Sequence, residues 1–356
     1  MAYYIEDRLG GPAIGQRRPT INEYFLSSYT MGVYDGCEFG CPYCDGWAYR
    51  LRPFNETVRV AVDLPDRVVD ELRAIDRGDL VGITAFSDPY QPAEGAYRLT
   101  RHVLRIFADV GQPCLVLTKS HTVLEDLALL ERIHERSLAV VVFTLLTIDP
   151  YLSEKLEDKA PAPALRLNAI AELRRAGIPV GVALLPVAPY VNDTDLLLNA
   201  TLRAVADAGA DFVLWDYLHI PDERHRARVS EMLARIGAYP PGYYRDLYRG
   251  QPTPDPLYRA ERDRELLALC DTLNLAVRAP HRLYAGRLRP HNEAALLLKH
   301  TAFRDAVQGR THLAREGRGL ADLVFRGEAT EAQLRASPLY SQLREILGGA
   351  GRASPS

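Results

Sequence analysis

The feature that most constrains the fold is an alternation of short apolar runs with amphipathic segments between about residues 29 and 217. The apolar runs are continuous, which is typical of parallel strands buried on both faces. Because each run is followed by a segment with helical spacing, the pattern predicts repeated βαβ units and an α/β fold. The predicted strands are 28–34, 80–86, 114–118, 138–145, 179–185 and 212–216, and the predicted helices between them are 66–75, 99–110, 124–135, 163–176 and 195–208.

The number of strands indicates which α/β architecture forms. A full (β/α)8 barrel needs eight strand–helix units, so six predict a partial (β/α)6 TIM-like barrel. A doubly wound sheet has the same periodicity, and the sequence alone leaves that architecture open.

The segments before and after the repeated region lack the alternation of strands and helices. Gly and Pro residues break any pattern over 1–28, so an irregular segment is expected there. The barrel is expected to span 29–221. A Tyr- and Pro-rich loop (239–258) and a helix (259–273) are expected to close the barrel within 222–290. The remaining residues, 291–356, predict a mostly helical C-terminal extension with a disordered tail.

Charge and hydropathy restrict the partners of the chain. The formal net charge of −3 lacks the basic excess that phosphate contacts favour, so nucleic acid is not supported by charge. The N-terminus does not resemble a signal peptide, and no run approaches the roughly 20 apolar residues of a membrane span. A cytoplasmic protein without membrane contact is expected.

Three of the five cysteines fall within eight positions, as Cys37, Cys41 and Cys44 in a C-x3-C-x2-C motif. An odd, clustered set without a secretion signal favours a metal site over disulfides. Three thiolates on one loop can bind three irons of a [4Fe–4S] cluster, leaving the fourth iron open. An open iron can chelate the amino and carboxylate groups of S-adenosyl-L-methionine (SAM) and pass an electron to its sulfonium.

Two other interpretations of the motif stay open. A zinc site needs a fourth ligand, and the nearest histidine in the sequence is His102. Three ordinary buried thiols are the second alternative. Cys114 and Cys270 are interpreted as buried apolar residues.

The motif, with the aromatic Tyr43 before its last cysteine, resembles the signature of the radical SAM superfamily. More of the chain resembles the spore photoproduct lyase-like branch. The resembling segments, in order, are Ser87–Glu94, Leu99–Arg101, Thr118–Ser120, Leu156–Glu157, Ala160–Pro161, Arg166–Leu167, Ala176–Ile178, Leu185–Val187 and Asn192–Asp193.

The resemblance implies a [4Fe–4S] cluster and SAM at the C-terminal ends of the barrel strands. It implies that SAM is bound through its amino group by Ser87 and Asp88, its carboxylate by Lys119 and Arg166, its ribose by Thr144 and its adenine by Pro186 and Val187. It also implies an electron donor such as flavodoxin or ferredoxin.

Each of the polar residues has a structural alternative. Asp88 is equally suited to cap a turn before Pro89, and Lys119 to be a solvated lysine. Thr144 suits a strand as a β-branched residue, and Arg166 suits a pair with Glu157.

The residues that face the substrate are harder to predict. Tyr217 and His219 end the sixth predicted strand and are candidate catalytic residues, although a structural histidine fits His219 equally well. Relatives tend to have Leu-Arg-Leu-Pro where this chain has Leu218–Pro221, which puts the family's substrate in doubt. Hydrogen abstraction from an unidentified substrate, nucleic-acid-related or a small molecule, is therefore the expected activity. An iron–sulfur redox or binding protein that does not cleave SAM is the alternative.

Overall fold

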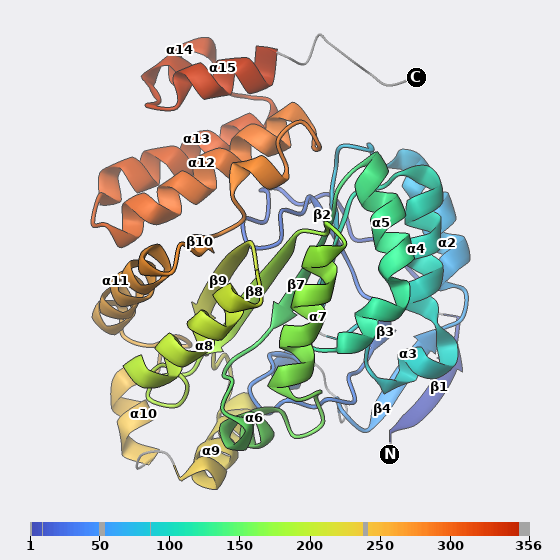
Figure 1. Cartoon of the computed structure of the whole chain (residues 1–356), viewed down its shortest axis with the longest axis vertical. Helices are drawn as coiled ribbons and strands as arrows, with labels where there is room; N and C mark the ends of the chain where they lie inside the picture. The colour runs from blue at the N-terminus through green and yellow to red at the C-terminus, as the bar shows by residue number, and fades with distance from the viewer. Residues whose placement is uncertain (1, 9, 50–53, 86, 238–240, 349–356) are drawn as a thin grey trace.

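The computed structural model describes the chain except residues 1, 9, 50–53, 86, 238–240 and 349–356. A parallel sheet of seven strands forms its centre (Figure 1). In spatial order the strands are β10 (Ala276–Val277), β9 (Phe212–Tyr217), β8 (Val180–Val187), β7 (Ala139–Thr144), β6 (Cys114–Thr118), β5 (Val81–Ile83) and β2 (Tyr29–Met31).

The strand order follows the chain order without a reversal, which decides between the two predicted architectures. A doubly wound sheet reverses direction at a switch point, and none occurs here. The strands β2 and β10 are the sheet edges, so the barrel is partial, as predicted. The six predicted strands are present, and the two-residue strand β10 was not predicted.

Helices cover the outer face of the sheet. Because successive side chains of each strand point to opposite faces, each strand contributes to two hydrophobic cores. In β7, Val141 and Phe143 join the core beneath the helices, and Val140 and Val142 join the core on the other face. The covering helices are α2 (Leu64–Glu71), α4 (Leu99–Val110), α5 (Leu127–Arg136), α7 (Pro163–Arg175) and α8 (Asp195–Asp207). Short helical turns are η1 (Leu72–Ala74), η2 (His121–Asp126) and η3 (His281–Leu283).

A second, three-stranded sheet lies beside the barrel and corrects the prediction for 1–28. Its strands, in the order β1 (Tyr3–Asp7), β4 (Thr57–Ala61) and β3 (Tyr34–Asp35), hold the N-terminus in a ladder. The five residues of β1 show no pattern that predicts a strand, because the strand forms by pairing with β4, in which Thr57 lies opposite Tyr3.

The C-terminal ends of the barrel strands form its mouth, which is flanked by α6 (Pro150–Glu157), α9 (Glu223–Ile236) and α10 (Pro241–Tyr248) (Figure 1). Helix α10 corrects the predicted loop over 239–258, of which 239 and 240 lie outside the described residues. Local propensity is poor there, but Tyr244 and Tyr248 stack one turn apart, and their hydroxyls donate to the carbonyls of Pro189 and Leu218. Tertiary contacts therefore fix this helix.

The opposite end of the barrel is its base, which the C-terminal helices cover (Figure 1). These helices are α12 (Pro290–Val307), α13 (Thr311–Arg326), α14 (Glu331–Ala336) and α15 (Tyr340–Gly348), and α11 (Pro256–Thr272) precedes them. The predicted disordered tail, 349–356, lies outside the described residues. Among the helices described, none is long and apolar enough to cross a membrane.

Candidate metal and cofactor site

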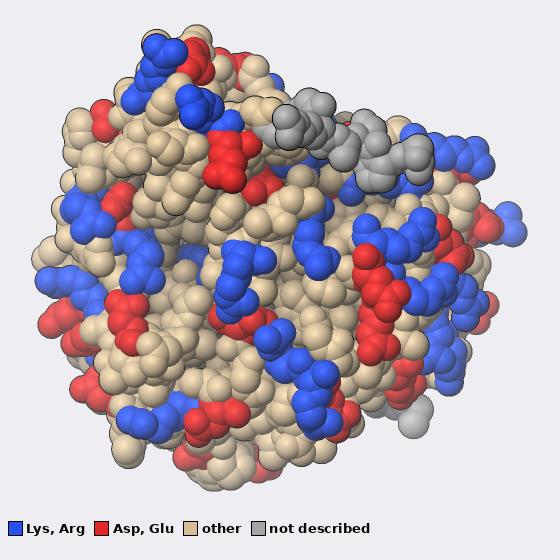
Figure 2. Space-filling model, turned by 45° about the horizontal axis from the view of Figure 1, so that its top comes forward, with Lys and Arg blue, Asp and Glu red and all other residues tan. Residues whose placement is uncertain are grey.

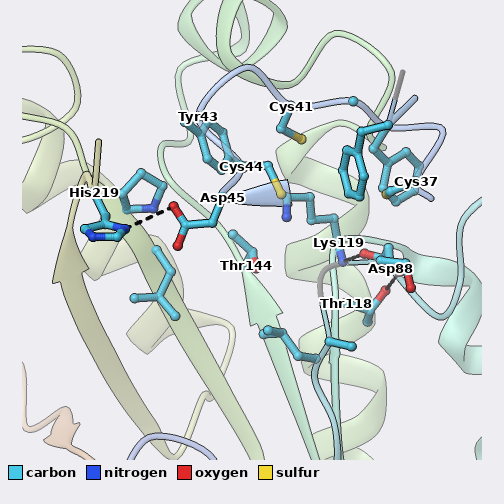
Figure 3. Close-up of a pocket in the computed structure, with 18 of the residues that line it drawn as sticks. Cys37, Cys41, Tyr43, Cys44, Asp45, Asp88, Thr118, Lys119, Thr144 and His219 are labelled. Carbon is cyan, nitrogen blue, oxygen red and sulfur yellow. Dashed lines mark hydrogen bonds and ion pairs between the residues drawn. The ribbon is translucent and has the colours of Figure 1, made fainter. Parts of the chain in front are cut away.

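The three motif cysteines lie on the loop between β3 and the short helix α1 (Gly46–Tyr49), at the mouth of the barrel. They line a cavity of about 470 Å³ (Figure 3). Other residues that line it are Phe39, Gly40, Tyr43, Asp45, Phe54, Ala85, Ser87, Asp88, Leu117, Thr118, Lys119, Thr144, Leu185, Pro186, Asp216, Tyr217, His219 and Thr253.

Two glycines let the loop wrap around this cavity. Gly36 has a φ of +112°, and a Cβ there would lie 2.3 Å from the carbonyl oxygen of Thr57. Gly40 has a φ of +55°, and its Cβ would lie 2.7 Å from that of Asn55. Any other residue would strain the backbone and clash, so both positions require glycine.

The thiols are free, and burial keeps them protonated. Desolvation raises the pKa of Cys37 and Cys41 to about 12 and that of Cys44 to about 11. Because thiolates are the metal ligands, binding must release protons. In the part of the chain that the structure describes, no group of three or more His, Cys, Asp or Glu side chains is arranged to hold a metal ion. Three thiols on one loop beside a cavity are the donor set of a cluster whose irons each take one thiolate.

Asp88 lies at the cavity, but protein donors occupy its carboxylate. Its Oδ1 accepts from the hydroxyl of Thr118 (2.7 Å) and the backbone N–H of Tyr90 (2.9 Å), and its Oδ2 from the N–H of Lys119 (2.7 Å). This geometry matches the turn-capping alternative and joins the ends of two strands.

Lys119 is the cation of the cavity (Figure 3). Burial alone would lower the pKa of its ammonium group, but Cys41, Glu157 and Asp88 together raise it above its usual value. Its Nζ lies 5.8 Å from the ring centre of Tyr43, and no hydrogen bond or ion pair reaches it from the described residues. The charge is therefore available to an anionic group in the cavity.

Three further predicted residues also lie at the cavity. The hydroxyl of Ser87 donates to the carbonyl of Tyr34 (2.6 Å). Thr144 ends β7, and Pro186 follows a cis peptide bond after Leu185. Threonine and serine hydroxyls and the apolar ring of Pro186 suit a nucleoside, which needs both polar and apolar contacts.

Comparison with known proteins gives a consistent result. The family model described as Radical SAM superfamily matches residues 31–201. An uncharacterised protein of Mycobacterium tuberculosis (strain ATCC 25618 / H37Rv) is 33% identical over 285 residues, covering 76% of this chain and 79% of that protein. This chain belongs to the radical SAM superfamily. Membership implies an enzyme that cleaves SAM with an iron–sulfur cluster and needs a reductant and a substrate.

Two other similarities concern named proteins. A spore photoproduct lyase variant with bound AdoMet and dinucleoside spore photoproduct has a TM-score of 0.56 and 13% identity, covering 70% of this chain and 76% of that chain. The radical SAM Nα-GlyT isomerase of Pseudomonas phage M6 is 23% identical over 246 residues, 69% of this chain and 50% of that protein. The first shows that the radical SAM fold predicted from the sequence is correct.

Two residues predicted to bind SAM lie elsewhere in this radical SAM enzyme. Arg166 is fully buried, and its Nη1 lies 2.5 Å from Oε2 of Glu157, the pairing that the alternative predicted. The hydroxyl of Tyr43 donates to the other oxygen of Glu157. Arg166 therefore supports the cysteine loop through Glu157 and Tyr43. Val187 is fully buried in the core beneath the helices and does not line the cavity.

The two candidate catalytic residues differ in how far their polar groups are bonded to the rest of the chain. The hydroxyl of Tyr217 lies 2.8 Å from Oδ1 of Asp263 and 3.0 Å from the carbonyl oxygen of Arg259, and its one proton is shared between these two acceptors on α11. His219 lines the cavity, and its Nδ1 lies 3.4 Å from Oδ1 of Asp45, the residue after the last cysteine (Figure 3).

Sequence reasoning missed several residues that contact the cysteine loop. The indole N–H of Trp47 donates to the carbonyl of Cys41 (2.9 Å), and the side chain of Gln91 bonds the loop on both sides of Cys37. His225 on α9 is fully buried with its Nδ1 4.0 Å from Asp45. Trp47 and Gln91 fall within or beside quoted motifs, but no local pattern shows which backbone group a side chain will reach.

Proposed function

We propose that Cys37, Cys41 and Cys44 hold one [4Fe–4S] cluster on which this enzyme reductively cleaves SAM for hydrogen abstraction from a substrate. The bound cluster would supply an electron to the sulfonium of SAM, giving methionine and a 5′-deoxyadenosyl radical. The observation that carries the proposal is the set of three free thiols on one loop facing a cavity that also contains Lys119.

The residues of the chain would bind and orient SAM. The ammonium of Lys119 would pair with the SAM carboxylate, because it is a cation at the cavity that has no hydrogen bond or ion pair from the described residues. Ser87 and Thr144 would contact polar groups of the nucleoside or amino acid, and Pro186 would pack on the adenine. Asp88 would hold the ends of two strands in place through Thr118 and Lys119, and Arg166 would hold the cysteine loop in place through Glu157.

The decisive experiment is anaerobic. Protein reconstituted with iron and sulfide is mixed with dithionite and SAM, and 5′-deoxyadenosine is measured. We expect the iron content of a single cubane cluster and formation of the nucleoside. An intact cluster without 5′-deoxyadenosine would favour the redox or binding protein, and iron far above one cluster would contradict the single site.

The substrate class is proposed from a named relative. The dinucleoside spore photoproduct bound to the spore photoproduct lyase variant favours a nucleic-acid-derived substrate, and a small molecule is the alternative. The net charge is −3, and Figure 2 shows basic and acidic side chains interspersed on the face over the C-terminal helices. The net charge, which lacks a basic excess, favours a short fragment over a long duplex.

A thymidine dinucleoside photoproduct tests this choice. Faster 5′-deoxyadenosine formation in its presence would support the nucleic-acid-derived class. A rate unchanged by this compound and by single-stranded and duplex oligonucleotides would favour a small molecule.

A further inference from the structure

We propose that Gln91 is a positioning residue, which holds the backbone on both sides of Cys37 in its cluster-binding conformation before iron binds. The inference rests on the proposed cluster-binding role of the cysteine loop. It concerns the preorganisation of that loop rather than the chemistry at the cluster.

The side-chain amide of Gln91 uses both of its polar atoms on the loop. Its Oε1 accepts from the backbone N–H of Glu38 (2.9 Å), and its Nε2 donates to the carbonyl of Gly36 (3.0 Å). These two residues flank Cys37 in the sequence. The amide is 1% exposed, so water cannot readily replace either bond.

The contact is reciprocal. Gln91 is the N-cap residue of α3 (Pro92–Tyr97), but its side chain makes no capping bond there. The carboxylate of Glu38 supplies that bond instead, because its Oε1 accepts from the N–H of Ala93 (2.9 Å). The hydroxyl of Tyr4 donates to the same oxygen (3.0 Å). The loop thus caps the helix, and the residue at the helix start holds the loop.

Glutamine is the side chain that this position requires. Glutamate lacks a donor for the carbonyl of Gly36, and asparagine is one methylene too short to keep both bonds. An apolar side chain would leave a buried N–H and a buried carbonyl without partners, which is costly.

The test uses cluster-free protein, so it does not depend on SAM cleavage. Hydrogen–deuterium exchange is measured over peptides that cover residues 36–41 in wild type, Gln91→Met and Gln112→Met. Gln112 is the matched control: it is also buried, and its Nε2 donates to the carbonyl of Asp79 (2.6 Å), before the start of β5. We expect exchange at the Glu38 amide to become at least about tenfold faster in Gln91→Met, because two hydrogen bonds of about 1 kcal/mol each are lost and about 1.4 kcal/mol corresponds to a factor of ten. Gln112→Met should leave these peptides unchanged.

A second variant and a second readout keep the inference open to refutation. Gln91→Asn keeps a buried amide and should show a smaller increase in the same peptides. After reconstitution, the cluster of Gln91→Met should have an altered midpoint potential and electron paramagnetic resonance signal, and that of Gln112→Met should match wild type. Unchanged exchange in both Gln91 variants, or an equal increase in Gln112→Met, would overturn the proposal. If the exchange results are as expected but no cluster forms in wild type, the proposed function fails separately.

Discussion

Lys119 at the mouth of the barrel and Asn292 at its base are both polar side chains at an end of the sheet, but their bonding differs. The ammonium group of Lys119 is without a hydrogen bond or ion pair from the described residues. Asn292, 1% exposed, donates to Ser28, Gly78 and Asp79 (3.1, 3.2 and 2.7 Å) and accepts from Arg17 (3.2 Å). The charged group of Lys119 at the mouth is available to a ligand, and the amide group of Asn292 at the base is bonded within the chain.

The difference assigns separate tasks to the two ends. The base network joins residues before β2 and β5 to α12, so it ties the C-terminal helices to the barrel. A site at the C-terminal strand ends and structural contacts at the N-terminal ends are the usual division in such barrels. Changes at the mouth should therefore alter cofactor binding, and changes at the base should alter stability.

The largest expected effect is at the mouth. Replacing Cys37, Cys41 or Cys44 singly by Ala should abolish stable cluster binding, because each thiolate is expected to hold one iron. Iron content after reconstitution measures this, and the thermal midpoint of the cluster-free protein should change little. Cys270→Ala, a buried thiol on α11, is the control and should keep the wild-type iron content. Full iron in any of the three motif variants would contradict the assignment of that ligand.

The next effect is a pH dependence at the base. Burial lowers the pKa of His300 on α12 to about 4, below its usual 6.5. The unfolded chain then binds a proton that the folded chain does not, so stability falls as the pH drops from about 6.5 to about 4. With about 1.4 kcal/mol per pH unit, the loss approaches about 3 kcal/mol.

Urea titrations of the cluster-free protein at several pH values measure this slope. His300→Gln should flatten it, and His312→Gln, an exposed residue on α13, should leave it unchanged. An equal slope in wild type and His300→Gln would show that other groups govern the dependence.

At the mouth, the sequence predicted where the site lies better than which residues contact one another there. The six strands and the cysteine motif depend on local patterns, and the structure shows the strands and places the motif at the cavity. The strand order, which local periodicity left open, comes from the structure. The partners of Arg166 and Gln91 depend on contacts between distant segments. Tyr43 and Glu157 are 114 residues apart, and Glu38 and Gln91 are 53 apart. Residue type alone gave Arg166 two partners, a SAM carboxylate or Glu157, and only folding distinguishes them.

The base was the less predictable end. Its helices follow from periodicity, but the network around Asn292 joins residues more than 200 positions apart. Strand β10 has two residues, and the apolar run Leu275–Val277 that contains it is too short to predict a strand. Both form because the barrel is already present to pack against.

A smaller effect is expected from Asn292→Ala. The change removes the hydrogen bonds from Asn292 to Oδ1 of Asp79 and to the hydroxyl of Ser28, although Oδ2 of Asp79 keeps its contact with Arg289 (3.4 Å). The free energy of unfolding should therefore fall by about 2 kcal/mol. Chemical denaturation measures this, and iron content should stay at the wild-type value. Asn199→Ala, on the exposed side of α8, is the control and should change stability by less than about 0.5 kcal/mol. Loss of cluster binding in Asn292→Ala would remove the distinction between the two ends.

The smallest effect should separate the two ends most sharply. Lys119→Met removes the cationic group of the cavity while keeping the length of its side chain, so SAM affinity of the cluster-loaded protein should fall about tenfold, as for one charge-assisted hydrogen bond. Titration with SAM, followed by the cluster's electron paramagnetic resonance signal, measures it. Lys159→Met, at an exposed position after α6, should bind SAM as wild type does. Stability should change by less than in Asn292→Ala, because no hydrogen bond to a described residue is lost. Wild-type SAM affinity in Lys119→Met would mean that the free charge at the mouth serves the substrate or the reductant rather than SAM.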